Sequence, residues 1–130
     1  MVLDTSAVHS ILRKEGVADR LIAALEQADT RSMSAATLVE SAIVMQARYG
    51  DSGEREIDVF LQRAGVDVVP VMSDHAEIAR SAFRRFGKGR HPAGLNFGDC
   101  FSYALAILLG EGLLFVGDDF GKTDVLVAGY

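Results

Sequence analysis

The sequence has 130 residues, of which 49% are hydrophobic, and a formal net charge of −5. This length and apolar content predict one domain over residues 1–130 with a proper core, and the acidic balance disfavours a non-specific nucleic-acid binder. The single cysteine, Cys100, excludes an internal disulfide and fits a reducing compartment such as the cytoplasm.

Apolar periodicity predicts short strands that alternate with helices along the whole chain. The expected strands are 1–4, 30–34, 66–71, 113–117 and 124–129. The expected helices are 5–15, 17–28, 35–50, 52–65, 73–89 and 98–110, with Gly50 ending the third and Ser73 or Asp74 capping the fifth. Short apolar strands between helices are typical of an α/β fold with three layers, in which a mainly parallel sheet has helices on both faces.

The most hydrophobic segment, residues 101–117, is interrupted by Glu111 and by two glycines. We expect a buried helix, a turn and a buried strand there, and no membrane span. No signal peptide is expected at the N-terminus, because a basic segment is missing and Asp4 interrupts the first apolar stretch.

Acidic residues stand where a parallel sheet would bring them to one rim. Asp4 ends the first strand, Asp118 and Asp119 end the fourth, and Glu40 and Asp99 lie early in apolar helices. Two carboxylates about 4 Å apart repel by about 4 kcal/mol at an effective dielectric near 20, so a cluster requires protons or a cation. Oxygen ligands suit Mg²⁺ or Mn²⁺, and no Cys/His spacing for zinc is present.

Each acid also has a purely structural interpretation. Asp4 can cap the first helix, and Thr37 and Glu40 have the spacing of a capping box. Asn96 and Asp99 can cap the last helix, and GDDF is typical of a turn. Convergence of the whole set on one rim favours a shared metal site over these separate roles.

Four short motifs occur in a characteristic order along the chain. They are VLDTSA at 2–7, SAATLVE at 34–40, GLNFGDCFSYALA at 94–106 and LLFVGDDFGKTDV at 113–125. Together they resemble the PIN-domain ribonucleases, and specifically the VapC-type toxins of bacterial type II toxin–antitoxin systems. The resemblance covers nearly the whole chain.

The resemblance implies a ribonuclease that hydrolyses RNA phosphodiester bonds with carboxylate-bound Mg²⁺ or Mn²⁺. By position it assigns catalytic roles to Asp4, Glu40, Asp99 and Asp118, and metal binding to Asp4, Asp99, Asp118 and Asp119. Asp118 is the first choice for the fourth acid because it follows the strand directly, and Asp119 is the second. Ser6 is expected to hydrogen-bond within the acid cluster, although it can also simply cap its helix.

The family also implies partners. These are a VapB-type antitoxin, whose C-terminal segment covers the groove and can place an arginine near the acids, and a second copy of the chain in a homodimer. RNA phosphates could be contacted by the basic segment that carries Arg84, Arg85, Lys88, Arg90 and His91, which is alternatively a solvated helix end.

Competing functions fit the sequence less well. The segment GDDFGKT is one residue too short for a P-loop, and a receiver domain usually has adjacent acids where MVLDTS has only Asp4. A structure-specific DNA nuclease needs helical insertions for which this chain has no room. The remaining alternative is a catalytically weak PIN module that acts as a protein or RNA binding partner, and the complete acid set argues against it.

Overall fold

The computed structural model describes residues 1–130 and contains a four-stranded parallel sheet in the order β3-β2-β1-β4. The strands are β1 (Val2–Leu3), β2 (Ser32–Ser34), β3 (Asp67–Val69) and β4 (Leu113–Leu114). The helices are α1 (Thr5–Leu12), α2 (Ala18–Gln27), α3 (Ala35–Tyr49), α4 (Asp51–Ala64), α5 (Ser73–Phe86) and α6 (Phe97–Leu109), followed by a 3₁₀ turn η1 (Phe120–Lys122). The predicted parallel α/β architecture is confirmed.

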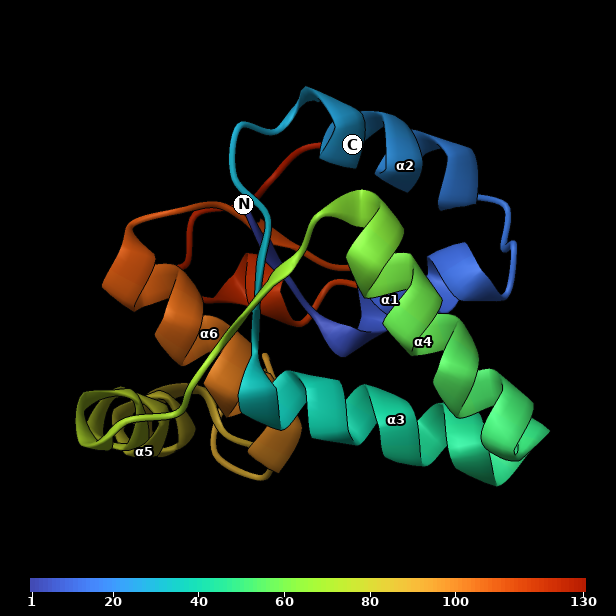
Figure 1. Ribbon diagram of the computed structural model, residues 1–130. Coiled ribbons are helices and arrows are strands. Elements are labelled where there is room, and N and C mark those ends of the chain that lie inside the picture. The colour runs from blue at the N-terminus through green and yellow to red at the C-terminus, as the bar shows by residue number, and fades with distance from the viewer.

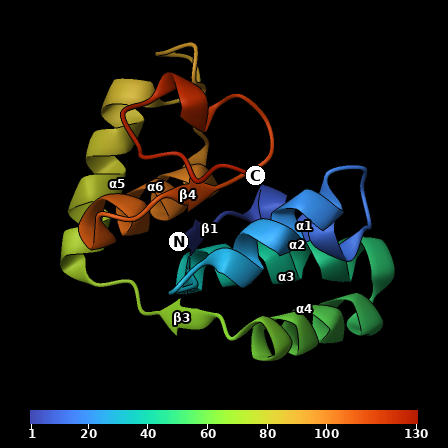
Figure 2. The same ribbon diagram turned by 90° about the horizontal axis from the view of Figure 1, so that it is seen from above.

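The helices lie in two layers with the sheet between them. Figure 2 shows α5 and α6 on one side of β1 and α1 to α4 on the other. In Figure 1, β1 (dark blue) lies in the middle of the molecule. The central strand is therefore covered on both faces, which is the arrangement that a parallel sheet requires.

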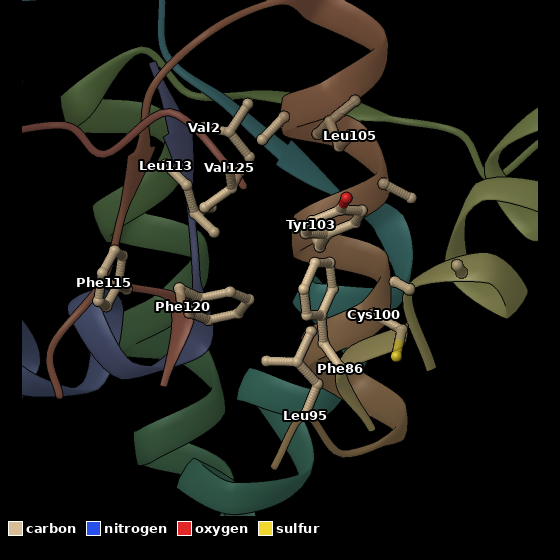
Figure 3. Packing of buried hydrophobic residues seen from close by; sticks show 14 of the residues in the cluster. Val2, Phe86, Leu95, Cys100, Tyr103, Leu105, Leu113, Phe115, Phe120 and Val125 are labelled. Atoms are coloured by element: carbon tan, nitrogen blue, oxygen red, sulfur yellow. The ribbon is translucent and has the colours of Figure 1, made fainter. Parts of the chain in front are cut away.

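Two hydrophobic cores meet at the sheet, because successive side chains of a strand point to opposite faces. Val2 and Leu113 pack in the core beneath α5 and α6. Leu3 and Leu114 pack in the core beneath α1 to α4. In Figure 3, Phe86, Tyr103 and Phe120 converge in the first of these cores. Burial on both faces explains why these short strands read as continuous apolar runs.

The parallel strands deliver the segments that follow them to one rim of the sheet. Asp4 follows β1, and its amide donates to the carbonyl of Leu114 in β4 at 3.0 Å. Helix α3 begins directly after β2, with the Ser34 side chain accepting from the amide of Ala36. The carboxyl ends of β1, β2 and β4 thus face the same side, where we predicted the acids to meet.

Two local predictions from the sequence are wrong. Residues 124–129 form no strand, and only Val127 bridges to Leu113. Two backbone hydrogen bonds, from the Leu113 amide to Leu126 and from the Ala128 amide to Leu113, hold this segment beside β4, but the pairing ends at that single bridge. Helix α5 has Met72 at its N-cap position without a side-chain cap, so neither Ser73 nor Asp74 fills that role.

The hydrophobic segment 101–117 forms a helix, a turn and a strand, as predicted. Helix α6 ends at Gly110, whose φ of 64° is a left-handed conformation that glycine adopts at little cost. Strand β4 follows and is buried. Across the structure, none of the helices combines the length and the apolar character needed to cross a membrane.

We expect the substitution Leu105→Ala to lower the free energy of unfolding by about 3 kcal/mol, because it opens a cavity in a close-packed core. Leu105 is 0% exposed on α6. Leu108→Ala on the same helix is the matched control, because Leu108 is 38% exposed. Urea unfolding measures both, and equal losses would contradict the assignment of the core.

Candidate active site

Asp4 is a buried carboxylate that receives hydrogen bonds from two helices. Its side chain is almost fully buried, with a relative exposure of 3%. Oδ2 accepts from the Ser6 amide at 3.0 Å and from the Ser6 hydroxyl at 2.6 Å, and Oδ1 accepts from the Ser102 hydroxyl at 2.7 Å. Hydrogen bonds to a charged acceptor offset much of the cost of burying it. Asp4 is therefore both the N-cap of α1 and a fixed charge at the rim.

Glu40 reaches from α3 toward the first turn of α6. Its Oε1 accepts a short hydrogen bond from the Thr5 hydroxyl. A Cβ atom at position 98 would stand 1.8 Å from Oε2, so only glycine lets the carboxylate come this close to the α6 backbone. The N-cap of α3 is Ser34, three residues before Thr37. The structural interpretation of Thr37 and Glu40 as a capping box is therefore wrong.

Asp99 combines the structural role and the site role that we weighed against each other. Its Oδ2 accepts from the Asn96 amide, and its own amide donates to Asn96 Oδ1, both at 2.9 Å, so the predicted cap of α6 is present. Burial, followed by the negative charges of Asp4, Glu40 and Asp119, raises the pKa of Asp99 to about 6, against the lowering effect of the Asn96 bond. Asp99 thus shares one electrostatic environment with three further acids.

The two acids of GDDF lie in different surroundings. Asp118 is exposed and forms an ion pair with Lys122, whose Nζ lies 3.0 Å from Oδ2 and lowers the pKa of Asp118. Asp119, by contrast, acts on Asp99. The first choice of Asp118 depended on its following a strand, but β4 already ends at Leu114. The charge of Asp119, which is also exposed, thus reaches Asp99, whereas the charge of Asp118 is balanced by Lys122.

The acid set fits a hard divalent cation by its chemistry. Asp4, Glu40, Asp99 and Asp119 offer only carboxylate oxygens, and the like charges that raise the pKa of Asp99 would be relieved by a cation. No three His, Cys, Asp or Glu side chains stand at the close mutual spacing of a formed metal site. The charges of the other three acids therefore act on Asp99, although the four carboxylates are not grouped at the spacing of a formed metal site.

Arg85 is tied into a network that sequence reasoning missed. Its Nη2 donates to Asp124 Oδ2 at 2.7 Å and its Nη1 to the Tyr103 hydroxyl at 3.3 Å, while that hydroxyl donates to Asp124 Oδ1 at 2.6 Å. These bonds join α5, α6 and the segment after η1. Arg85 is thus engaged within the protein, whereas Arg84 and Lys88 are exposed and form no ion pair.

Four residues around the acids have roles that the sequence analysis did not assign. They are Thr5, Thr37, Gly98 and Ser102. The position of Ser102 carried a usable signal, since it is a small hydroxyl within an otherwise apolar helix. No local pattern marks the observed roles of the other three, because their partners are distant in sequence.

A groove lies at the far end of α1 from the acids. It is a hollow of about 730 Å³ between α1, α2 and α4. Apolar side chains of Ile11, Ile22 and Val59 line it, together with charged side chains that include Arg55 and Arg63. Because α1 begins beside Asp4 and ends at this groove, one short helix connects the two features.

Comparison with known proteins is consistent across sequence and structure. The family model of the PIN domain matches residues 1–126. Ribonuclease VapC30 of Mycobacterium tuberculosis is 53% identical over 125 residues, which cover 96% of this chain and 95% of that protein.

Solved structures agree in fold. The crystal structure of Mycobacterium tuberculosis VapC20, described as a sarcin-ricin loop cleaving toxin, matches with a TM-score of 0.76 and 21% identity, over 96% of this chain and 95% of that one. A toxin–antitoxin complex from Klebsiella pneumoniae matches with a TM-score of 0.73 and 18% identity, over 99% of this chain and 97% of that one.

In the absence of a bound metal ion, ionisation of Asp99 should lower the free energy of unfolding. Its folded pKa of about 6 lies above the ordinary value of 3.8, so its favourable contribution is complete below pH 3.8 and is lost as the pH rises through about 6. Asp99→Asn keeps an oxygen for the Asn96 bond and removes the charge. In EDTA, the stability of the variant relative to the unsubstituted chain should therefore rise by about 1 kcal/mol as the pH increases from about 4 to about 6.5, a value discounted for solvent screening.

Chemical unfolding at several pH values measures this difference. A difference that stays constant with pH would contradict the shared environment of the four acids. Leu108→Ala, which changes no charge, provides the pH-independent control.

Proposed function

The chain belongs to the PIN-domain family and is a VapC-type ribonuclease toxin of a toxin–antitoxin system, and on this premise we propose that RNA is cleaved at the rim where Asp4, Glu40, Asp99 and Asp119 converge. The observation that carries the proposal is that hydrogen bonds fix Asp4 at the end of β1 while the Glu40 carboxylate lies against Gly98, the neighbour of Asp99. In agreement, burial and the charges of the other three acids raise the pKa of Asp99. Like charges gathered at strand ends are typical of an active site that holds a cation.

The four acids would hold Mg²⁺ or Mn²⁺, which in this family assists phosphodiester hydrolysis by polarising the phosphate and lowering the pKa of water. Asp4 provides a rigid anchor, because hydrogen bonds already fix both of its oxygens. Glu40 is oriented by Thr5 and by its close approach to Gly98. Asp99 and Asp119 would complete the acidic shell from the start of α6 and the loop after β4.

RNA would be held by local basic residues, since the overall charge is negative. Arg84, Lys88 and Arg90 are exposed at the end of α5 and in the loop that leads to α6. We leave Arg85 out of this set, because its guanidinium is bound to Asp124. Contacts from these residues to phosphates would position the strand beside Asp99.

We propose the groove between α1, α2 and α4 as the site for a segment of a VapB-type antitoxin. An antitoxin partner is expected because structurally similar chains occur in toxin–antitoxin complexes. The apolar walls suit a partner helix or strand, and an arginine at its end could pair with the acids at the other end of α1. Both the antitoxin and the RNA are expected in the cytoplasm.

We also propose that residues 1–130 act as one domain and pair as a homodimer. The single domain is supported by the sheet, in which β1 and β4 pair although nearly the whole chain separates them. Exposed apolar side chains of Val39 and Ile43 on α3 and of Phe97 on α6 offer area for a second copy.

The first prediction separates the two candidates for the fourth acid. Asp119→Asn should lower cleavage of total cellular RNA by more than about 100-fold, because loss of a metal ligand costs more than loss of a supporting contact. Asp118→Asn should leave cleavage unchanged, because Asp118 is exposed and paired with Lys122. Cleavage is followed on gels with and without Mg²⁺ or Mn²⁺.

Asp99→Asn serves as the inactive reference in the same assay, and its fold is checked by thermal unfolding. Strong loss in Asp118→Asn with full activity in Asp119→Asn would restore the original choice of Asp118. Discrete cuts that persist in Asp99→Asn would sink the whole site assignment, and absence of cleavage by the folded, antitoxin-free protein would favour a binding module.

Gly98→Ala should abolish most cleavage while leaving the fold intact. The new Cβ would collide with Glu40 Oε2, and this flexible side chain can swing away at small cost to stability. We expect about a tenfold or greater loss of activity, as for other disturbed positioning contacts. Gly16→Ala is the matched control, because a Cβ there meets nothing within 4 Å. Equal activity of the two variants would remove Glu40 from the proposed site.

A further inference from the structure

A chain of buried hydroxyl groups leads from α3 through α6 to Asp4. Ser102 is 0% exposed and Thr37 is 1% exposed. The Ser102 hydroxyl lies 2.7 Å from Asp4 Oδ1 and 3.0 Å from the Thr37 hydroxyl. A carboxylate only accepts hydrogen bonds and a hydroxyl has one proton to donate. The direction is therefore fixed: Thr37 donates to Ser102, and Ser102 donates to Asp4.

The donor count distinguishes the two oxygens of Asp4. Oδ2 accepts two hydrogen bonds, from the amide and the hydroxyl of Ser6. Oδ1 accepts one, from Ser102. Because each carboxylate oxygen has two lone pairs, Oδ1 is the oxygen with a lone pair left for a cation. Ser102 thus acts on the oxygen that is available for coordination.

The same two hydroxyls lie one helical turn from the other acids. Thr37 precedes Glu40 on α3, and Ser102 follows Asp99 on α6, each at a spacing of three residues that places side chains on neighbouring positions of a helix. The hydrogen bond between Thr37 and Ser102 therefore joins the two helices beside both acids, while Ser102 joins α6 to the end of β1.

We propose that Ser102, supported by Thr37, is a positioning residue that orients Asp4 Oδ1 for divalent-metal binding. The inference rests on the proposed function, because it takes Asp4 to be a metal ligand. Without the Ser102 hydroxyl, Oδ1 would lose its only protein donor inside a buried site, and the carboxylate would no longer be held in one orientation toward the other acids.

Direct binding of Mn²⁺, measured by the loss of the free-ion EPR signal, tests the role separately from catalysis. Ser102→Ala should weaken binding about tenfold, which corresponds to about 1.4 kcal/mol. Thr37→Val keeps the shape and removes the donor, and should weaken binding about threefold, since its effect passes through Ser102. Thr37→Ser retains a hydroxyl and should restore binding.

Ser10→Ala is the matched control. Ser10 is also a buried serine whose hydroxyl donates to a carboxylate, that of Glu15 at 2.7 Å, but it has no contact with the acids of the rim. Its Mn²⁺ affinity should equal that of the unsubstituted protein. Ser102→Ala should lose more RNA-cleavage activity at low Mn²⁺ than at saturating Mn²⁺. A purely structural role does not produce this dependence on the metal concentration.

Unchanged Mn²⁺ affinity in folded Ser102→Ala would overturn the inference. A purely structural role would appear as a loss of stability in Ser102→Ala that is the same in EDTA and in Mn²⁺, with no change in Mn²⁺ affinity. If Ser102→Ala does not fold, Thr37→Val decides in the same way. Failure of the proposed function looks different: the unsubstituted protein itself would then bind no Mn²⁺ and cleave no RNA, whatever the variants do.

Discussion

The carboxylate of Asp4 is buried at the end of the central strand, and a buried charge must be surrounded by donors. Helix α1 supplies the amide and hydroxyl of Ser6, and α6 supplies the hydroxyl of Ser102. The Ser6 hydroxyl in turn accepts from the amide of Val116, beyond β4. The hydrogen bonds that surround this one carboxylate thus connect α1 and α6 with the ends of β1 and β4. They fix the position of Asp4 relative to the helix that carries Asp99.

Periodicity was enough to predict the architecture, and position along the chain pointed to the acids that we propose for the site. Strands β1 and β4 are apolar because both of their faces are covered, and Val2 and Leu3 accordingly enter different cores. A parallel sheet then brings the segment after each strand to one rim, which places Asp4 and the start of α3 with Glu40. The cap formed by Asn96 and Asp99 was readable from a local spacing, and it proved compatible with a place beside the other acids.

What the sequence did not reveal depends on partners far along the chain. Thr37 and Ser102 meet although 65 residues separate them, and no local pattern records that contact. Arg85 appears free in a basic segment but is bound to Asp124. The order within GDDF favoured Asp118, whereas Asp118 is paired with Lys122 and the charge of Asp119 acts on Asp99. The expected strand at 124–129 is reduced to a single bridge between Val127 and Leu113.

The order of the strands has a consequence during translation. The strand at the centre of the sheet is synthesised first, but β4 and the donor Ser102, which follows Asp4 by 98 residues, emerge late. At about 5–20 residues per second, the ribosome needs several seconds to deliver them. Until then the nascent chain has Asp4 and Glu40 but neither Asp99 nor Asp119. A partly synthesised toxin therefore lacks two of the four acids of the proposed site while it is still attached to the RNA-rich machinery that makes it.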